Sequence, residues 1–401
     1  MKRSILFLMS LVLLSAACKK NRLGELKTSS VTVSAKYPSA YSQPAASGVT
    51  ITLKSITDGS VKTGATAANG DAVFADVLPG NYTITATRNL TATEAQPLTG
   101  ISAAITLNGV QNNVTVTSGQ NAKFVVQLGG SAVGNLLIKE VYYTGSKTPG
   151  GGTYFSDQFV EIYNNATDTI YLDSLCIADA YGNSGLINPN SLPTAFKTDN
   201  SSTYVSNLWQ IPGTGKQHPL APGKSIIVAQ DGVNHKDPAL NPASPVDLST
   251  AEWETYNERP DNRDADAPGV PNLTRVYFTG GFDWLLPVGG PGVIIFKADF
   301  ASLQQVPIPG APAAIPPRIK VPNVVIIDAF EALKDGSSAS FKRIPVGVDA
   351  GFVFADDIYN MQSFRRKTST TINGRRVLQD TNNSGADFEK IASPTPKGFY
   401  L

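Results

Sequence analysis

The chain of 401 residues carries 33 basic and 32 acidic side chains, and its formal net charge of +1 gives no electrostatic basis for binding nucleic acid or an anionic membrane surface. Its length allows two or three domains with substantial hydrophobic cores. With 35 Gly, 27 Pro and few amphipathic helical stretches, the composition favours β-strands joined by turns, so an all-β fold is predicted.

The N-terminal segment has the features of a bacterial export signal. A basic start at residues 1–3 precedes residues 4–17, an apolar run shorter than the roughly 20 residues that a membrane-spanning helix needs. Cys18 follows the small residues Ala16 and Ala17, and this arrangement resembles a lipobox. The resemblance implies that a signal peptide, residues 1–17, is removed and that Cys18 is lipidated. Ordinary secretion is the alternative.

A lipid on Cys18 would hold the protein on the outer membrane, each acyl chain contributing about 0.8 kcal/mol per buried CH2. Residues 18–27 are then a polar tether. Because residues 19–22 are not acidic, the sequence leaves open whether the protein faces the periplasm or the cell surface. Cys176 would have no disulfide partner within the chain, and its apolar neighbours in sequence predict a small buried hydrophobe.

Residues 28–128 are predicted to form a small, separate β-domain. Several segments alternate with period two, and Asp58-Gly59 and Asn69-Gly70 supply turns between some of them. The expected strands are 31–35, 49–53, 72–74, 82–86 and 124–128. Residues 66–74 and 77–84 resemble the carboxypeptidase-regulatory-like, transthyretin-like sandwich, which implies a spacer or docking platform. The Gly-rich start of residues 129–135 predicts a flexible linker.

The second predicted domain, residues 136–401, is organised around residues 157–173. This stretch predicts two β-strands and a turn, because it is rich in β-branched and aromatic residues on either side of Asn and Asp. Val160 and Ile162 point to one face of the first strand, and Phe159 and Tyr163 point to the other. Both faces carry large groups, so the strand is expected inside a sandwich with neighbours on both sides.

Several segments of this domain resemble a lamin-tail domain, an immunoglobulin-like sandwich, and they occur in the order of that family. They are 159–164 with 170–173 and 175–177, 208–212 with 220–228, and 363–367 with 380–388 and 394–398. The chain is longer than the family at residues 233–270 and 301–322. The first insertion is polar and is expected to be functional or disordered, and the Pro-rich second is expected to run extended over the surface. The predicted fold is therefore two immunoglobulin-like or transthyretin-like β-sandwiches in tandem.

The acidic residues of the first insertion do not match a known metal-binding pattern. Asp261, Asp264 and Asp266 lie close together in sequence. A calcium loop needs oxygen ligands at alternating positions and a Gly at its sharp turn, and Arg263 and Pro268 break that pattern. A solvated acidic loop is predicted here.

No other group of polar residues identifies a catalytic site. Glu161, Asp168 and Asp173 could pair for acid–base chemistry, but nothing distinguishes them from polar residues at strand edges. His218 and His235 lack the His or Cys cluster that zinc requires. The sequence has no Gly-x-Ser-x-Gly elbow, phosphate-binding loop or dinucleotide fingerprint. We therefore predict no catalytic residue, metal or cofactor, and expect that the protein is not an enzyme.

Aromatic residues are the better candidates for a binding role. Exposed aromatic side chains can stack on sugar rings or anchor a protein partner. Trp253, Tyr256 and His235 lie in the first insertion, and Trp284 follows it. Trp209 lies in the lamin-tail-like segments and is expected in the core. The candidate ligand or partner contacts are thus Trp253, Tyr256, Trp284 and His235.

As a whole, the chain resembles an uncharacterised group of Bacteroidetes lipoproteins, which look like accessories to outer-membrane transport systems of the TonB-dependent kind. The resemblance implies a lipid-anchored, non-catalytic binding or assembly protein of the cell envelope that contacts an outer-membrane receptor or transporter. The alternative is a glycan-binding or glycan-degrading surface lipoprotein, because Trp and Tyr stand beside Asp and Glu in the insertion. Nucleic acid is not an expected partner.

Overall fold

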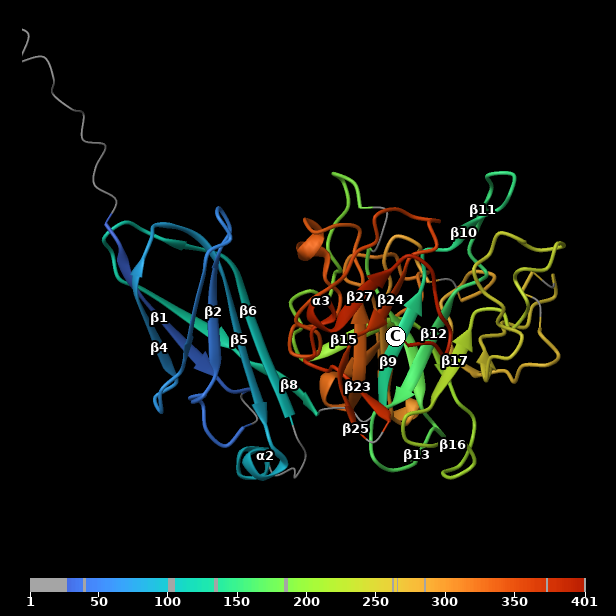
Figure 1. Cartoon of the computed structure of the whole chain (residues 1–401), viewed down its shortest axis with the longest axis horizontal. Coiled ribbons are helices and arrows are strands. Elements are labelled where there is room, and N and C mark those ends of the chain that lie inside the picture. The colour runs from blue at the N-terminus through green and yellow to red at the C-terminus, as the bar shows by residue number, and fades with distance from the viewer. Residues whose placement is uncertain are drawn as a thin grey trace, which may run out of the picture.

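The computed structural model describes residues 27–38, 41–99, 105–132, 136–183, 187–261, 263–264, 266–284, 286–372 and 374–399. The predicted signal peptide, Cys18 and nearly all of the predicted tether lie outside these residues. The described residues form two β-rich bodies beside one another (Figure 1). Within the described part of the chain, no helix has the length and apolar character needed to cross a membrane.

The first body is a sandwich of a three-stranded sheet, in the order β4-β1-β7, and a five-stranded sheet, in the order β3-β2-β5-β6-β8. Alternating side chains such as Val31 and Val33 in β1, and Ile51 and Leu53 in β2, fill the space between the sheets. The elements are β1 (Ser29–Lys36), β2 (Thr50–Ser55), β3 (Val61–Ala65), β4 (Asp71–Val77), β5 (Gly80–Leu90), α2 (Ala92–Thr99), β6 (Ile105–Val116), β7 (Ala122–Gln127) and β8 (Gly129–Ala132).

The second body contains two larger sheets. The six-stranded sheet has the order β18-β17-β12-β9-β24-β27, and the seven-stranded sheet has the order β21-β22-β15-β14-β20-β23, with β19 paired to β15. The first comprises β9 (Leu136–Tyr142), β12 (Phe159–Asn164), β17 (Ser225–Ala229), β18 (Trp253–Glu254), β24 (Ser363–Arg366) and β27 (Phe388–Ile391). The second comprises β14 (Cys176–Ala180), β15 (Ser202–Gln210), β19 (Thr274–Tyr277), β20 (Gly292–Phe296), β21 (Gln304–Val306), β22 (Arg318–Pro322) and β23 (Ile326–Glu331).

Short elements complete the second body. Three two-stranded ribbons are formed by β10 (Ser146–Lys147) with β11 (Thr153–Tyr154), β13 (Ile170–Tyr171) with β16 (Pro219–Leu220), and β25 (Thr368–Ile372) with β26 (Arg375–Leu378). The helical turns are η1 (Phe300–Ser302), η2 (Asn323–Val325), η3 (Ser338–Phe341) and α3 (Ser384–Asp387). The two sandwiches confirm the predicted all-β fold.

Both faces of β12 are buried, as its sequence predicts. Val160 and Ile162 lie in the main core with Trp209, Phe159 packs in a second cluster on the outer face, and Tyr163 packs with Leu137 and Leu378. The second strand of the 157–173 stretch, β13, pairs with β16 and not with β12. Cys176 is buried, as predicted.

The second predicted insertion, residues 301–322, is extended over the surface only in part. Residues 312–316 are exposed, in agreement with the prediction. At its end, however, β22 joins the seven-stranded sheet beside β15, and Ile319 and Val321 are fully buried there. The alternation of Ile319 and Val321 is a strand pattern that the surrounding prolines obscure.

Residues 129–135 are predicted to form a flexible linker, but the prediction is wrong for the first four of them. They form β8, an edge strand that pairs antiparallel with β6. A Cβ on Gly129 would lie 2.5 Å from Cα of Gly347 in the second body, so the close approach of the two backbones requires glycine. Asn108 Nδ2 also donates to the backbone oxygen of Thr381 at 3.1 Å. The two bodies are therefore in direct contact through β6 and β8.

A buried arginine links the two sheets of the second body. Arg366 in β24 is 3% exposed, and its guanidinium donates to Asp328 in β23 at 2.6 Å. Asp387 and Asp380 lie 3.4 Å and 3.5 Å from the same group, and the backbone oxygen of Ile138 accepts a further hydrogen bond at 2.9 Å. Removing one member of such a buried group leaves the charge of the others uncompensated, and an uncompensated buried charge strongly destabilises the fold.

Replacing Arg366 with Met should therefore leave buried carboxylates without a cation and lower the free energy of unfolding by about 3–5 kcal/mol. Urea denaturation followed by circular dichroism measures this change. Lys390→Met is the matched control, because Lys390 lies in the adjacent strand β27 and pairs with the exposed Asp356. It should leave the midpoint nearly unchanged, and equal losses in the two variants would contradict the assignment.

Candidate functional site

The described residues of the insertion at 233–270 are ordered and cover part of the outer face of the six-stranded sheet. Val246 and Leu248 of the insertion pack with Phe159 of β12 in one buried cluster. Within the insertion, β18 extends the sheet by pairing parallel with β17. Of the two expectations for this segment, disorder is therefore wrong for its described residues.

Two of the aromatic candidates are buried. Trp253 is 7% exposed and Trp284 is 3% exposed, and both belong to the main core. Trp253 packs edge-on against His218, with ring centroids 5.0 Å apart, and Trp284 Nε1 donates to Asp179 Oδ1 at 2.8 Å. The expectation that Trp253 lies exposed on the insertion is wrong, and Trp284, whose sequence fits either a core or a contact role, lies in the core. Tyr256 is half-buried and stays a candidate.

His235 is also a structural residue. It is fully buried, and its Nε2 lies 3.0 Å from the backbone oxygen of Asp231 while its Nδ1 lies 2.8 Å from the hydroxyl of Tyr154. Since a carbonyl oxygen only accepts, Nε2 carries the proton and Tyr154 donates to Nδ1. Burial lowers the pKa of His235 to about 4, so the ring is neutral at physiological pH. The buried ring of His235 has no exposed face in this structure, and its role as a ligand or partner contact stays a prediction.

Three carboxylates come together beside this histidine. Asp231 follows β17, Asp264 lies in the insertion, and Asp283 precedes β20, and each offers an oxygen within 4.8 Å of the other two. Asp264 is 3% exposed and Asp283 is 6% exposed, so the predicted solvated loop is wrong for Asp264. Its sequence neighbours Asp261 and Asp266 are exposed, as predicted.

Neighbouring polar groups hold this acidic cluster (Asp231, Asp264 and Asp283) in place. The backbone N–H of Asn257 donates to Asp264 Oδ2 at 2.8 Å, and the Gln230 amide Nε2 donates to Asp283 Oδ2. Burial, followed by the charges of the other two carboxylates, raises the pKa of Asp231. Burial and then the charge of Asp283 raise the pKa of Asp264 to about 7.

A fourth buried acidic residue, Glu254, lies near the cluster and acts on the pKa of Asp264. Burial raises the pKa of Glu254 to about 7, although its oxygens accept the backbone N–H groups of Gly232 and Ala267 at 2.7 Å and 2.8 Å. Burial also raises the pKa of Asp283, partly offset by its hydrogen bond from Gln230. The site thus concentrates carboxyl groups in an environment that disfavours their charge.

Sequence analysis missed this cluster because its members are far apart in the chain. Asp261 and Asp266, the sequence neighbours of Asp264, are exposed and do not belong to the cluster. The one signal in the sequence is positional, since Asp231 lies three residues after 220–228, a segment that resembles the lamin-tail family. Residues that follow a strand can meet other loops at the same end of a sheet, but the sequence does not say which ones.

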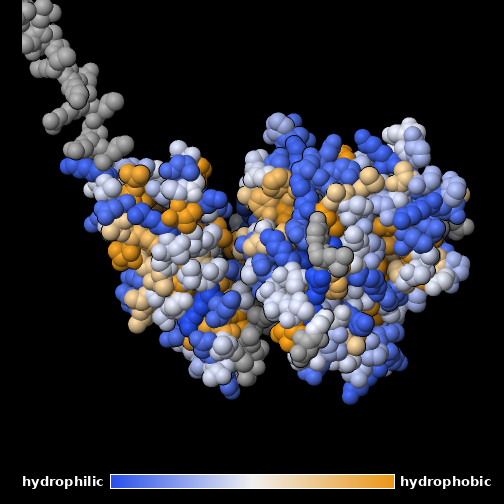
Figure 2. Space-filling model, viewed as in Figure 1, coloured by the Kyte–Doolittle hydropathy of each residue, from blue (hydrophilic) through white to orange (hydrophobic). Residues whose placement is uncertain are grey.

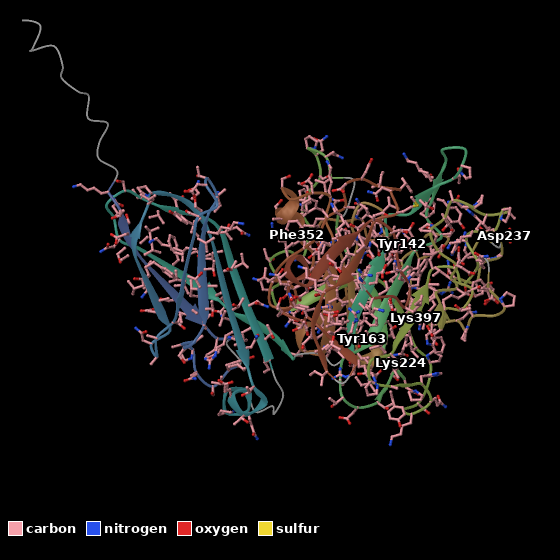
Figure 3. All side chains as sticks on the ribbon, in the orientation of Figure 1. Tyr142, Tyr163, Lys224, Asp237, Phe352 and Lys397 are labelled. Atoms are coloured by element: carbon pink, nitrogen blue, oxygen red, sulfur yellow. The ribbon has the colours of Figure 1, made fainter. Side chains whose placement is uncertain are left out.

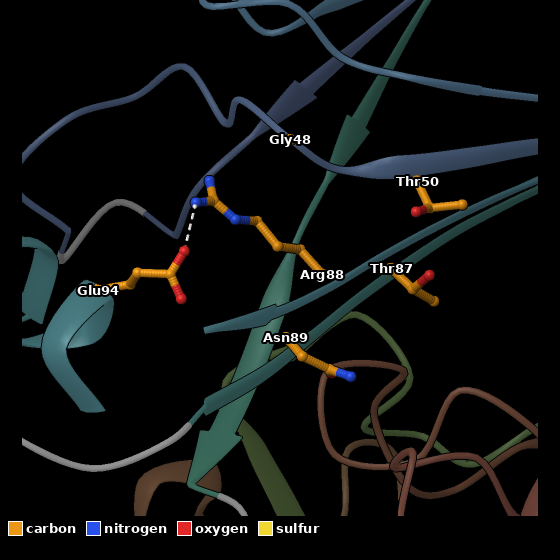
Figure 4. A pocket seen from close by; sticks show the side chains of 6 residues that line it. All are labelled: Gly48, Thr50, Thr87, Arg88, Asn89 and Glu94. Carbon is orange, nitrogen blue, oxygen red and sulfur yellow. Dashed lines mark ion pairs between the residues drawn. The ribbon is translucent and has the colours of Figure 1, made fainter. Parts of the chain in front are cut away.

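The first body has a surface pocket of about 320 Å³ (Figure 4). It is lined by Gly48, Thr50, Thr87, Arg88, Asn89 and Glu94. Arg88 and Glu94 face each other across it at 3.7 Å, and Arg88 also donates to the Tyr37 hydroxyl and the Ser47 backbone oxygen. Arg88, the one basic residue in this lining, is therefore bound by neighbours from its own domain. The lining residues include no pair of groups arranged for catalysis.

The carboxylates considered for acid–base chemistry have structural partners. Glu161 accepts from Lys139 Nζ at 2.8 Å, and both side chains are buried. Asp173 accepts backbone N–H groups of Gln217 and His218, which with that of Gly215 lower its pKa to about 2 despite the opposing effect of desolvation. The geometry around these residues supports structural roles.

The fold and this cluster define an all-β protein of two sandwiches whose second domain carries an acidic, loop-built site. Residues 221–395 match a family described as "Protein of unknown function (DUF4876)". Residues 31–102 match the second beta sandwich domain of the BOS complex subunit NOMO1-like family. Each match covers less than half of the chain. No curated protein matches it.

Among solved structures, the chain is similar to a DUF4876 family protein from Bacteroides thetaiotaomicron, with 26% identity and a TM-score of 0.59 over 92% of this chain and 97% of that one. The two-sandwich architecture is thus shared with that protein. The major pilin SpaD from Corynebacterium diphtheriae (10% identity, 51% of this chain and 66% of that one, TM-score 0.19) and a DUF3823 family protein from Bacteroides uniformis (8% identity, 77% and 100%, TM-score 0.17) also match. Scores this low support no argument.

The burial of Trp253 gives a direct test of its role. Trp253→Ala should lower the free energy of unfolding by about 3–5 kcal/mol, because it removes a large side chain from the main core. The matched control is Tyr256→Ala, which removes the nearby half-buried aromatic residue and should cost clearly less. Urea denaturation measures both, and a Trp253→Ala variant as stable as the parent protein would refute a core role.

Proposed function

We propose that this chain is a non-catalytic binding or assembly protein of the bacterial cell envelope, held on the outer membrane by a lipid on Cys18. The observation that carries the binding role is the insertion at residues 233–270, an ordered loop structure added to a complete sandwich. Asp237 within it lies at the end of the second domain that is far from the first domain (Figure 3).

The insertion packs one side on the sheet and exposes the other. Val246 and Leu248 are among its buried apolar residues, whereas Lys236, Asp237 and Leu240 are exposed. In Figure 2, the end of the second domain that carries the insertion is mainly hydrophilic. A surface that is already ordered loses little conformational entropy when a partner binds, which favours affinity.

The order of the domains supports presentation of this surface to a partner. The described chain enters the first sandwich at β1, which begins on the side of this sandwich that is far from the second domain (Figure 1). A lipid at Cys18 would therefore place the first sandwich nearer to the membrane as a spacer. The second sandwich, which we propose is lamin-tail-like, would present the insertion away from the anchor.

The partner that we propose is an outer-membrane receptor or transporter of the TonB-dependent kind, on the basis of the sequence resemblance of the whole chain to accessory lipoproteins. The glycan-directed alternative rested on Trp253, Tyr256 and acids in the insertion. With Trp253 and Trp284 in the core, only Tyr256 remains as a partly accessible aromatic candidate. The protein-partner role therefore has the stronger support.

Lipidation predicts that Cys18→Ser abolishes membrane attachment. When the protein is expressed in a bacterium with the lipoprotein pathway, the parent chain should incorporate radiolabelled palmitate and sediment with membranes. The variant should be unlabelled and recovered in the soluble fraction. Cys176→Ser is the control, because Cys176 is buried within the second domain and should not affect labelling. Labelling of the Cys18→Ser variant would refute the anchor.

The proposed partner can be sought by affinity purification from native membranes in mild detergent, with mass spectrometry of the bound proteins. Phe399 packs edge-on against Tyr163, so the C-terminal tag needs a flexible spacer. We expect a β-barrel receptor in stoichiometric amount. Recovery of the chain alone would overturn the accessory role and direct attention to glycans.

Paired variants locate the binding surface. Lys236→Ser with Leu240→Ser changes two exposed residues of the insertion and should reduce recovery of the partner at least tenfold. Lys54→Ser with Ile56→Ser changes the same kinds of exposed residue on the first domain and should retain the partner. Equal recovery with both pairs would exclude the insertion as the contact surface.

A further inference from the structure

The acidic cluster of the second domain has no cationic partner among the described residues. Elsewhere in this domain, buried acids such as Glu331 and Asp328 bind Arg or Lys within about 3 Å. No such ion pair reaches Asp231, Asp264 or Asp283, although Asp264 and Asp283 are almost completely buried. An uncompensated group of buried carboxylates is strongly unfavourable.

A second feature of the same place points to a ligand. Asp231 Oδ1, Asp283 Oδ1 and Gln230 Oε1 are buried and accept no hydrogen bond. Gln230 is 3% exposed, and its amide nitrogen contacts Asp283, so its head group lies at the cluster. A buried acceptor without a donor costs about 1–3 kcal/mol, and several at one point indicate that a bound group satisfies them together.

Protons are the alternative to a cation at this cluster. Burial and then the neighbouring carboxylates raise the pKa of Asp231 to about 8 and that of Asp264 to about 7, so protons reduce the negative charge when no ion is bound. The hydrogen bonds from Asn257 to Asp264 and from Gln230 to Asp283 fix two of the carboxyl groups, and the oxygens of all three lie within 4.8 Å of one another. A cation can therefore replace the protons without rearranging the cluster.

The donor set selects the class of cation. All available ligand atoms are hard oxygens, and both nitrogens of the nearby His235 are occupied by Tyr154 and the Asp231 backbone oxygen. This disfavours zinc, which prefers His and Cys. Calcium accepts irregular sets of oxygen ligands at about 2.3–2.6 Å, and a single ion can reach oxygens that lie within 4.8 Å of one another. Magnesium demands a tighter octahedron.

We propose that Asp231, Asp264 and Asp283, together with the Gln230 amide oxygen, form a Ca2+ site in the second domain. The ligands come from the end of β17, from the insertion and from the segment before β20. An ion at this point joins the segment before β20 to the end of β17 and to the insertion. It also neutralises the carboxylates that the fold buries.

Calcium binding can be measured on the purified full chain in detergent after treatment with a chelator. Isothermal titration with CaCl2 should give one site per chain. At a free Ca2+ concentration 100 times Kd, the thermal midpoint should rise by about 5–10 °C. MgCl2 at the same concentration should give a much smaller shift. A flat titration with Ca2+, or a site that takes Mg2+ equally well, would overturn the proposal.

Variants test the ligands individually. Asp264→Asn and Asp283→Asn should each weaken Ca2+ binding at least tenfold, whereas Asp261→Asn, which changes an exposed acid of the same insertion, should bind as the parent does. Because the first two remove buried charges, circular dichroism establishes whether they fold. Unchanged Ca2+ binding in a folded Asp264→Asn variant would refute this ligand set.

Terbium luminescence locates the ion without removing a ligand. Tb3+ takes oxygen ligands as Ca2+ does, and it emits when a nearby indole is excited. Trp284 directly follows Asp283, so Tb3+ bound at the cluster should be sensitised and then displaced by Ca2+. Trp284→Phe should reduce the emission severalfold while leaving Ca2+ affinity nearly unchanged. Emission that is insensitive to both Ca2+ and Trp284→Phe would place the metal elsewhere and overturn the proposal.

Discussion

The buried guanidinium of Arg366 is the interaction on which the second sandwich depends most. Arg366 belongs to the six-stranded sheet, and it binds Asp328 of the seven-stranded sheet at 2.6 Å. Asp328 also accepts the backbone N–H of Ile138 at 2.6 Å, so one carboxylate joins β23 to both β24 and β9. Apolar contacts between sheets are not directional. These hydrogen bonds are directional, so they form only when the two sheets have one particular position relative to each other. We infer that the pair specifies how the two sheets are aligned, in addition to the core that holds them together.

Two further buried acids of this domain are also paired with cations. Glu331 is satisfied by Lys342 and Arg343, and Glu161 by Lys139. In each case the cost of removing a carboxylate from water is offset by a cation at hydrogen-bonding distance. The acidic cluster differs, since its carboxylates meet one another and not a basic side chain. Other buried acids without a cation, such as Glu254 and Asp349, accept hydrogen bonds on both of their oxygens, whereas the cluster leaves Oδ1 of Asp231 and Oδ1 of Asp283 without a donor, and a bound cation explains this difference.

The sequence predicted those features that depend on neighbours along the chain. Period-two alternation placed Val160 and Phe159 on opposite faces of β12, and both faces are buried. It failed where long-range packing decides. Gly129 resembles part of a linker, yet it pairs with β6 in β8, and its lack of a side chain is required by the close approach of Gly347 in the other domain. The acidic cluster was missed for the same reason, because its members meet only after the sheets and the insertion have folded. Trp253 was misjudged because its polar sequence neighbours concealed a strand at the sheet edge.

The insertion connects the cluster to the proposed binding surface. Its apolar side chains fix it to the sheet, and Asp264 fixes it again at the cluster, so the exposed segment around Asp237 is held between two points. Loops without such attachments lose conformational entropy when a partner binds, and that loss weakens affinity. Here the ordering occurs when the domain folds and, on our proposal, when calcium binds. The same burial that removed Trp253 and Trp284 as contact residues therefore strengthens the argument for recognition, because it makes the surface above them rigid.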